Sequence, residues 1–129
     1  MKERSPSKPN FEKLHVYKLS QDLADRIWDV VGGWDRFARE TVGIQIVRSA
    51  DSIGANIAEG VGRGSHADNR RFVRTARGSL NETIHFLRRA FRRRLLSKAQ
   101  TETLKPLLDE LPPRLNAYLN SIGRFPDAA

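Results

Sequence analysis

Cysteine is absent from this 129-residue chain, so the sequence offers neither a disulfide framework nor a thiolate metal site. No apolar run approaches the ~20 residues that a membrane-spanning helix needs. The polar first ten residues lack the apolar segment of a secretory signal. Alternating strand patterns, internal repeats and low-complexity tracts are also missing. These absences predict a cytoplasmic protein without membrane contact and leave helices as the source of its fold.

Four segments carry apolar residues at the spacing of amphipathic helices. The predicted helices cover residues 14–31, 41–61, 65–95 and 97–122. Trp34 and Phe37, in the first connection, are expected to close one end of the core. Four such helices with short connections predict an all-α fold, an antiparallel up-down four-helix bundle. The bundle domain is expected to span residues 11–123, between flexible tails at 1–10 and 124–129.

Local signals mark where the predicted helices end or bend. The glycine-rich run at residues 60–65 favours a tight turn over a nucleotide loop, because it lacks the Lys-Ser/Thr of a P-loop and follows a helix. Ser97 and Gln100 form a capping box before the last helix. Within that helix, Pro112-Pro113 predicts a kink or a break.

The formal net charge of +8 is concentrated in one segment. Residues 63–98 contain eleven basic and two acidic residues, and ten of the eleven are arginines. Arginine contacts phosphate bidentately and stacks on bases, whereas lysine acts mainly as a point charge. This asymmetry indicates an anionic partner.

On a helical wheel, the arginines of the third predicted helix form two rows on its exposed face. The first row contains Arg70, Arg74, Arg77, Arg88 and Arg92, and the second contains Arg71, Arg89 and Arg93. The first row spans a sector of roughly 60° and a length of about 33 Å, with Asn81 and His85 between its arginines. Phe91 is assigned to the core face. Like charges at i,i+4 repel, so a helix face that is merely solvated normally alternates basic and acidic residues. The arginine rows lack such acidic residues and therefore favour polyanion binding over the alternative of a solvated surface.

A polar stripe on the second predicted helix is expected to face the third. The stripe consists of Arg48, Ser52, Asn56, Glu59 and Arg63. The register of the hairpin predicts an Arg48–Glu82 ion pair. It also predicts that the two helices cross closely at four small residues, namely Ala50, Gly54, Gly78 and Ser79.

These patterns favour a non-enzymatic, oligomeric protein that binds RNA or DNA through backbone phosphates. The alternative is an adaptor whose arginines dock an acidic protein. Glu59 and Glu82, the candidate catalytic acids, have no second acid, histidine or metal-ligand set near them, so no enzyme, metal or cofactor is expected. Ile44 and Phe86, apolar residues off the core stripes, predict an oligomer.

The run from Gly43 to Glu82 resembles the bacterial four helix bundle proteins, also called 23S rRNA intervening-sequence proteins. The matching pieces are Gln45–Ala50, Ser52–Gly60, Gly62-Arg63, Arg71-Phe72 and Ala76–Glu82, and Phe11–Tyr17 resembles the family's opening. The family's signature residues carry over onto Arg48, Asn56, Glu59, Arg63, Gly78, Ser79 and Glu82.

The resemblance implies a bundle that assembles into a ring-shaped homopentamer. Some members of the family are encoded inside insertions in the large-subunit ribosomal RNA gene. Relatives accompany the reverse transcriptase of diversity-generating retroelements, which makes such an enzyme a possible acidic partner. Two features depart from the family pattern, namely Pro112-Pro113 and the dense arginines from Arg88 to Arg94.

Overall fold

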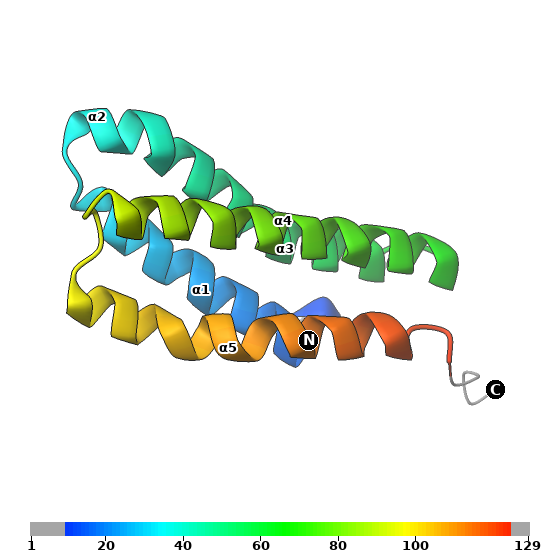
Figure 1. The fold of residues 1–129 in the computed structure, drawn as a ribbon. Helices are drawn as coiled ribbons and strands as arrows, with labels where there is room; N and C mark the ends of the chain where they lie inside the picture. The colour runs from blue at the N-terminus through cyan, green and yellow to red at the C-terminus, as the bar shows by residue number, and fades with distance from the viewer. Residues whose placement is uncertain (1–9, 125–129) are drawn as a thin grey trace, which may run out of the picture.

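The computed structural model of the chain describes residues 10–124. Four long helices dominate this range, which contains no β-strand (Figure 1). They are α1 (His15–Gly32), α3 (Ile44–Val61), α4 (His66–Arg92) and α5 (Lys98–Ser121). The predicted all-α fold is confirmed. Apart from Asn10, which opens a short 3-10 helix (Asn10–Lys13), and Arg124, the two predicted tails lie outside the described residues.

The capping box of α5 forms as the sequence predicts, and α4 also has a side-chain cap. The Ser65 hydroxyl accepts a hydrogen bond of 3.1 Å from the backbone N–H of Asp68. At α5, Ser97 Oγ accepts from the Gln100 N–H at 3.1 Å, and Gln100 Oε1 accepts from the Ser97 N–H at 2.9 Å. Each cap satisfies backbone donors that the first turn of a helix leaves without partners.

The second predicted helix begins earlier than expected. A three-residue helix, α2 (Arg36–Ala38), and a π-helical turn (Arg39–Gly43) lead directly into α3. Asp35 caps this segment, because its carboxylate accepts from the Ala38 N–H at 2.9 Å. The π-helical turn brings Gly43 so close to α1 that a Cβ there would lie 2.9 Å from Val31 Cγ1.

The α5 helix runs unbroken through Pro112-Pro113, so the predicted break is wrong. Each interior proline costs a helix roughly 3 kcal/mol. The same helix buries a continuous leucine stripe, with Leu104, Leu111 and Leu115 at most 2% exposed. Each buried leucine contributes about 1.5–3 kcal/mol. The continuous leucine stripe packs α5 against the core, which opposes the local preference of its prolines.

One end of the core is closed by one of the two predicted aromatics. Trp34 is buried, and its Nε1 donates to the Leu95 carbonyl oxygen over 2.8 Å, which joins the α1–α2 connection to the α4–α5 connection. Phe37 is 79% exposed instead, whereas Ala38 and Val42 from the same segment are buried. Its predicted place in the core is wrong.

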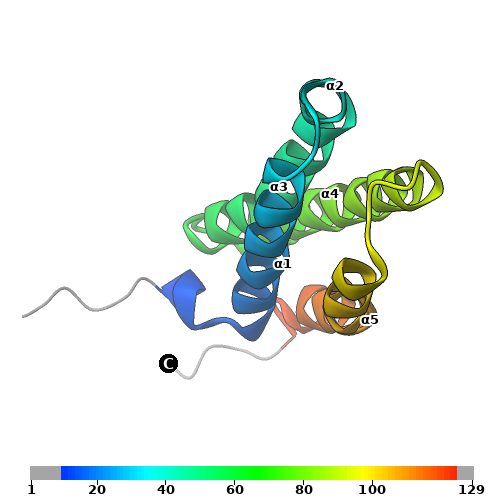
Figure 2. The same ribbon diagram turned by 90° about the vertical axis from the view of Figure 1, so that its left-hand side faces the viewer.

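The four long helices contact one another in the cyclic order α1, α3, α4, α5. Figure 2 shows α4 and α5 standing apart at the ends that residues 93–97 connect. A groove lies between the two helices there. Phe91, which the wheel assigned to the core, is accordingly 58% exposed.

Candidate nucleic-acid interface

The eight predicted binding arginines all lie on α4 or in the turn that follows it. Seven of them are exposed, and Arg70 is half-buried. Of these eight, only Arg71 has a carboxylate of residues 10–124 within 4.0 Å of its guanidinium group, namely Asp68 at 3.5 Å. The helix therefore carries its positive charge largely without internal neutralisation.

The first arginine row follows the seam between α4 and α5. Arg70 Nη1 donates to the Ile122 carbonyl oxygen over 3.1 Å, and Arg77 Nη1 donates to Asn116 Oδ1 over 3.3 Å. These two guanidinium groups hold the C-terminal half of α5 against α4. Sequence reasoning treated them as free binding groups, but the structure gives each of them a partner.

Further along the seam, the two helices separate and leave a groove of about 550 Å³. Its α4 wall includes Ile84, Leu87 and Phe91, and its α5 wall includes Leu104 and Leu108. Most of the lining is apolar.

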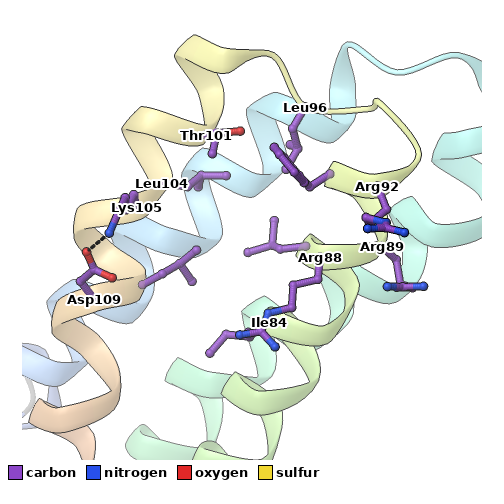
Figure 3. Close-up of a pocket in the computed structure, with 12 residues that line it drawn as sticks. Ile84, Arg88, Arg89, Arg92, Leu96, Thr101, Leu104, Lys105 and Asp109 are labelled. Atoms are coloured by element: carbon purple, nitrogen blue, oxygen red, sulfur yellow. Dashed lines mark hydrogen bonds and ion pairs between the residues drawn. The ribbon is translucent and has the colours of Figure 1, made fainter.

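The charged side chains of the groove lie at its edges. In Figure 3, the guanidinium group of Arg88 lies beside Ile84 at the α4 edge, while Arg89 and Arg92 extend from α4 further out. On the α5 edge, Lys105 Nζ binds Asp109 Oδ2 over 2.6 Å. That edge is therefore neutralised internally, whereas the arginines opposite are not.

The second arginine row is less uniform than predicted. Arg89 and Arg93 are exposed and have no carboxylate partner in the described range. Arg71 shares its charge with Asp68, and its guanidinium lies 4.7 Å from the Phe72 ring centroid. Arg63 lies 4.8 Å from the same ring, so Phe72 packs under two cations.

The predicted Arg48–Glu82 ion pair does not form between α3 and α4. Both side chains are exposed, and neither is part of an ion pair in the described residues. An exposed pair contributes at most about 1 kcal/mol, too little to determine how two helices pack. The stripe makes local contacts instead: Glu59 pairs with Arg63 over 2.8 Å, and Asn56 Nδ2 donates to the Ser52 carbonyl oxygen over 2.8 Å.

Hydroxyl groups form a polar contact between α3 and α4. Ser79 Oγ lies 3.1 Å from Ser52 Oγ, and Thr83 Oγ1 lies 2.9 Å from Ser49 Oγ. We refer to these four residues as the hydroxyl seam. Sequence reasoning singled out Ser52 and Ser79 but missed Ser49 and Thr83. The available signal was their spacing, because Ser49 precedes Ser52 by three residues and Thr83 follows Ser79 by four, which places each pair on one helix face.

The remaining residues of the predicted small-residue crossing lie elsewhere. Gly54 faces α1, where a Cβ would lie 3.0 Å from Ser20 Oγ. Gly78 faces outward, and a Cβ there would meet nothing within 4 Å. Ala50 is buried, and it lines a hollow between α1 and α3 together with Tyr17. Of the two predicted residues on α4, Ser79 contacts α3 as expected and Gly78 does not.

No cluster of three or more His, Cys, Asp or Glu side chains that would hold a metal ion occurs in the described part of the chain. None of the described helices is long and apolar enough to cross a membrane.

Burial raises the pKa of Asp51, and the nearby Asp25 carboxylate raises it further. Burial also raises the pKa of Tyr118. Neither shift occurs at the arginine rows.

The fold and this surface define a small, all-α helical protein with unpaired arginines on one helix. Over residues 12–117 the chain matches the family model described as 23S rRNA-intervening sequence protein, and it belongs to that family.

A similar solved structure is a protein with unknown function from the S23 ribosomal protein family of Bacteroides thetaiotaomicron. The two chains are 27% identical, with a TM-score of 0.71, over 82% of this chain and 99% of that one. No curated protein matches the chain significantly.

Proposed function

We propose that this protein is a non-enzymatic, cytoplasmic nucleic-acid-binding protein that contacts the phosphates of RNA or DNA through α4. The observation that carries the proposal concerns the guanidinium groups of five predicted arginines. These groups have no carboxylate within 4.0 Å and no hydrogen-bond partner in the described residues. They are Arg74, Arg88, Arg89, Arg92 and Arg93. Guanidinium groups that are free to form bidentate contacts suit phosphate binding.

The other three predicted arginines have a smaller role in this proposal. Arg70 and Arg77 hold α5 and contribute to the positive field of α4 without leaving their partners. Arg71 is partly neutralised by Asp68. Membership of a family named after an intervening sequence of ribosomal RNA supports a nucleic acid as the anion.

We also propose that an antiparallel up-down bundle is the protomer of a ring-shaped homopentamer. The pairing of Ser49 with Thr83 and of Ser52 with Ser79 supports opposite directions for α3 and α4. Large apolar side chains on the surface support assembly, since Trp28 is 65% and Ile44 46% exposed. Sedimentation at micromolar concentration tests this proposal, and a monomer would contradict it.

The salt dependence of binding tests the proposed function. The logarithm of the affinity for duplex DNA should fall with log salt at a slope near −0.9 per phosphate neutralised. Replacing Arg74, Arg88 and Arg92 together with alanine should flatten that slope by about 2.7. Undetectable binding at low salt, or an unchanged slope in this variant, would remove the proposal.

A matched control separates the α4 surface from net charge. Arg26, Arg36 and Arg114 are each paired with a carboxylate of their own helical segment, namely Asp22, Glu40 and Glu110. Replacing these three with alanine changes the net charge equally but should leave the slope nearly unchanged.

An adaptor that docks an acidic protein, such as a reverse transcriptase, is the alternative function. The apolar lining of the α4–α5 groove favours it, because apolar surface flanked by arginines also suits protein partners. An adaptor keeps its partner in a pull-down from nuclease-treated lysate, whereas a nucleic-acid-binding protein loses what it held through RNA or DNA.

A further inference from the structure

Phe91 occupies an unusual position for a large apolar side chain. It is 58% exposed and lies on the wall of the α4–α5 groove. Arg88 and Arg92 are its neighbours at i−3 and i+1 on the same helix, and both line the groove. An aromatic ring that is open to solvent and flanked by unpaired guanidinium groups is suited to stack on nucleobases.

The groove offers room for such bases. Its volume of about 550 Å³ lies within the range of roughly 300–1,000 Å³ typical of sites for small organic groups. Its floor is aliphatic, from Leu87 and Leu104, and the Thr101 hydroxyl and Lys105 ammonium lie along the α5 side. A nucleobase matches this arrangement, because its apolar faces can contact the aliphatic floor and its polar edges can reach the hydroxyl and the ammonium group.

We propose that the groove binds bases of a single-stranded nucleic acid, with one base stacked on Phe91 and the flanking phosphates held by Arg88 and Arg92. The inference rests on the proposed function and specifies its ligand. A duplex stacks its bases inside the double helix, so it presents no base face to Phe91 and leaves the apolar groove unused. A single strand can place its bases in the apolar groove and its phosphates on the arginines of α4 at the same time.

The charge pattern favours a nucleic acid over an acidic amphipathic peptide. The unpaired arginines of the first row extend from Arg92 back to Arg74, about 27 Å along the helix. The groove occupies only the last part of that length, since none of its lining residues on α4 precedes Ile84. A peptide docked in the groove leaves Arg74 without a partner, whereas a polyanion with regularly spaced charges continues along the row.

Fluorescence anisotropy with the full-length protein tests the inference, using oligothymidylate of about 12 nucleotides and a duplex of equal length. The single strand should bind more tightly than the duplex. Phe91→Ala should weaken single-strand binding by about tenfold, the effect of losing one stacked base, and change duplex binding less than twofold. Phe91→Trp should restore single-strand binding.

Phe37→Ala is the matched control, because Phe37 is also a solvent-exposed phenylalanine but lies in α2, outside the groove. It should leave both affinities unchanged. Circular dichroism of each variant checks that the helices remain folded. A single-strand affinity that is unaffected by Phe91→Ala overturns the inference.

The results also distinguish failure of the inference from failure of the proposed function. Equal binding of both oligonucleotides, with the salt slope still dependent on the α4 arginines, overturns the inference and leaves the proposed function standing. No binding of either oligonucleotide overturns both. An acidic amphipathic peptide that binds more tightly than oligothymidylate, through Phe91, also overturns the inference in favour of a protein ligand.

Discussion

The hydroxyl oxygens of Thr83 on α4 and Ser49 on α3 lie 2.9 Å apart in a contact from which solvent is excluded. Thr83 is fully buried and Ser49 is 4% exposed. Two further acceptors complete the arrangement: the Ser79 carbonyl oxygen lies 2.8 Å from Thr83 Oγ1, and the Ile46 carbonyl oxygen lies 3.1 Å from Ser49 Oγ. The hydroxyl seam thus satisfies its own polar groups, as a buried polar contact requires.

Thr83→Val should lower the free energy of unfolding by about 1 kcal/mol, because valine keeps the shape and loses the hydrogen bond. Urea denaturation measures the change. Ser49→Ala combined with Thr83→Val should cost less than the sum of the two single changes, since neither partner is then left unmatched. Thr75→Val is the control, because Thr75 lies exposed on the same helix. A loss as large for Thr75→Val as for Thr83→Val would contradict a specific role for the seam.

Two glycines should respond to alanine in opposite directions. A Cβ at Gly60 would lie 3.1 Å from both the Asn69 carbonyl oxygen and Phe72 Cβ, so Gly60→Ala forces α3 and α4 apart. It should lower the free energy of unfolding by about 1–3 kcal/mol. Gly78→Ala should raise it by about 0.5–1 kcal/mol, because a Cβ there meets nothing and alanine favours a helix. Denaturation of both variants checks the signs, and a stabilising Gly60→Ala would contradict the close approach.

Arg70 and Arg74 should differ in what they contribute, although both belong to the first row. Arg70→Met removes the hydrogen bond to the Ile122 carbonyl oxygen and should cost about 1.5–3 kcal/mol of stability. Arg74→Met should leave stability within about 0.5 kcal/mol and flatten the salt slope of nucleic-acid binding by about 0.9. Thermal unfolding and the binding series measured on both variants test this division. Equal losses of stability would contradict it.

The pKa shift of Asp51 predicts a pH-dependent effect of one substitution. Burial, and then Asp25, raises the pKa of Asp51 above its ordinary value of 3.8. The folded state therefore holds this proton more tightly than the unfolded state, and stability is lost as pH rises through the folded pKa. Asp51→Asn should raise Tm slightly at neutral pH and have no stabilising effect below the ordinary carboxyl range.

Asp22→Asn is the control for that prediction. Asp22 pairs with Arg26 over 2.9 Å, so removing its charge should give no gain in Tm at neutral pH. A gain for Asp51→Asn that persists unchanged at acidic pH would show that charge is not its cause.

The four long helices, the all-α class and the α5 capping box were predictable because each depends on local spacing. Ser97 and Gln100 are three residues apart, and their side chains meet wherever a helix begins there. The unbroken α5 was not predictable in the same way. The local cost of Pro112-Pro113 is visible in the sequence, but the packing that offsets it belongs to the whole bundle.

The candidate site was predictable in part for the same reason. A wheel places the arginines relative to their own helix axis, and seven of the eight are exposed as expected, while Arg70 is half-buried. It does not give the direction of the neighbouring helix, so the partners of Arg70 and Arg77 on α5 were missed. The exposure of Phe91 was missed because it follows from the spread between α4 and α5, which no local pattern encodes.

The bond from Trp34 to the Leu95 carbonyl oxygen anchors the connection beside the groove. This short segment joins α4 to α5 at the end of the two helices where the groove lies. Leu96, the next residue, lines the groove, whereas Trp34 does not. The indole thus braces the connection beside the groove although it is not part of the groove's lining.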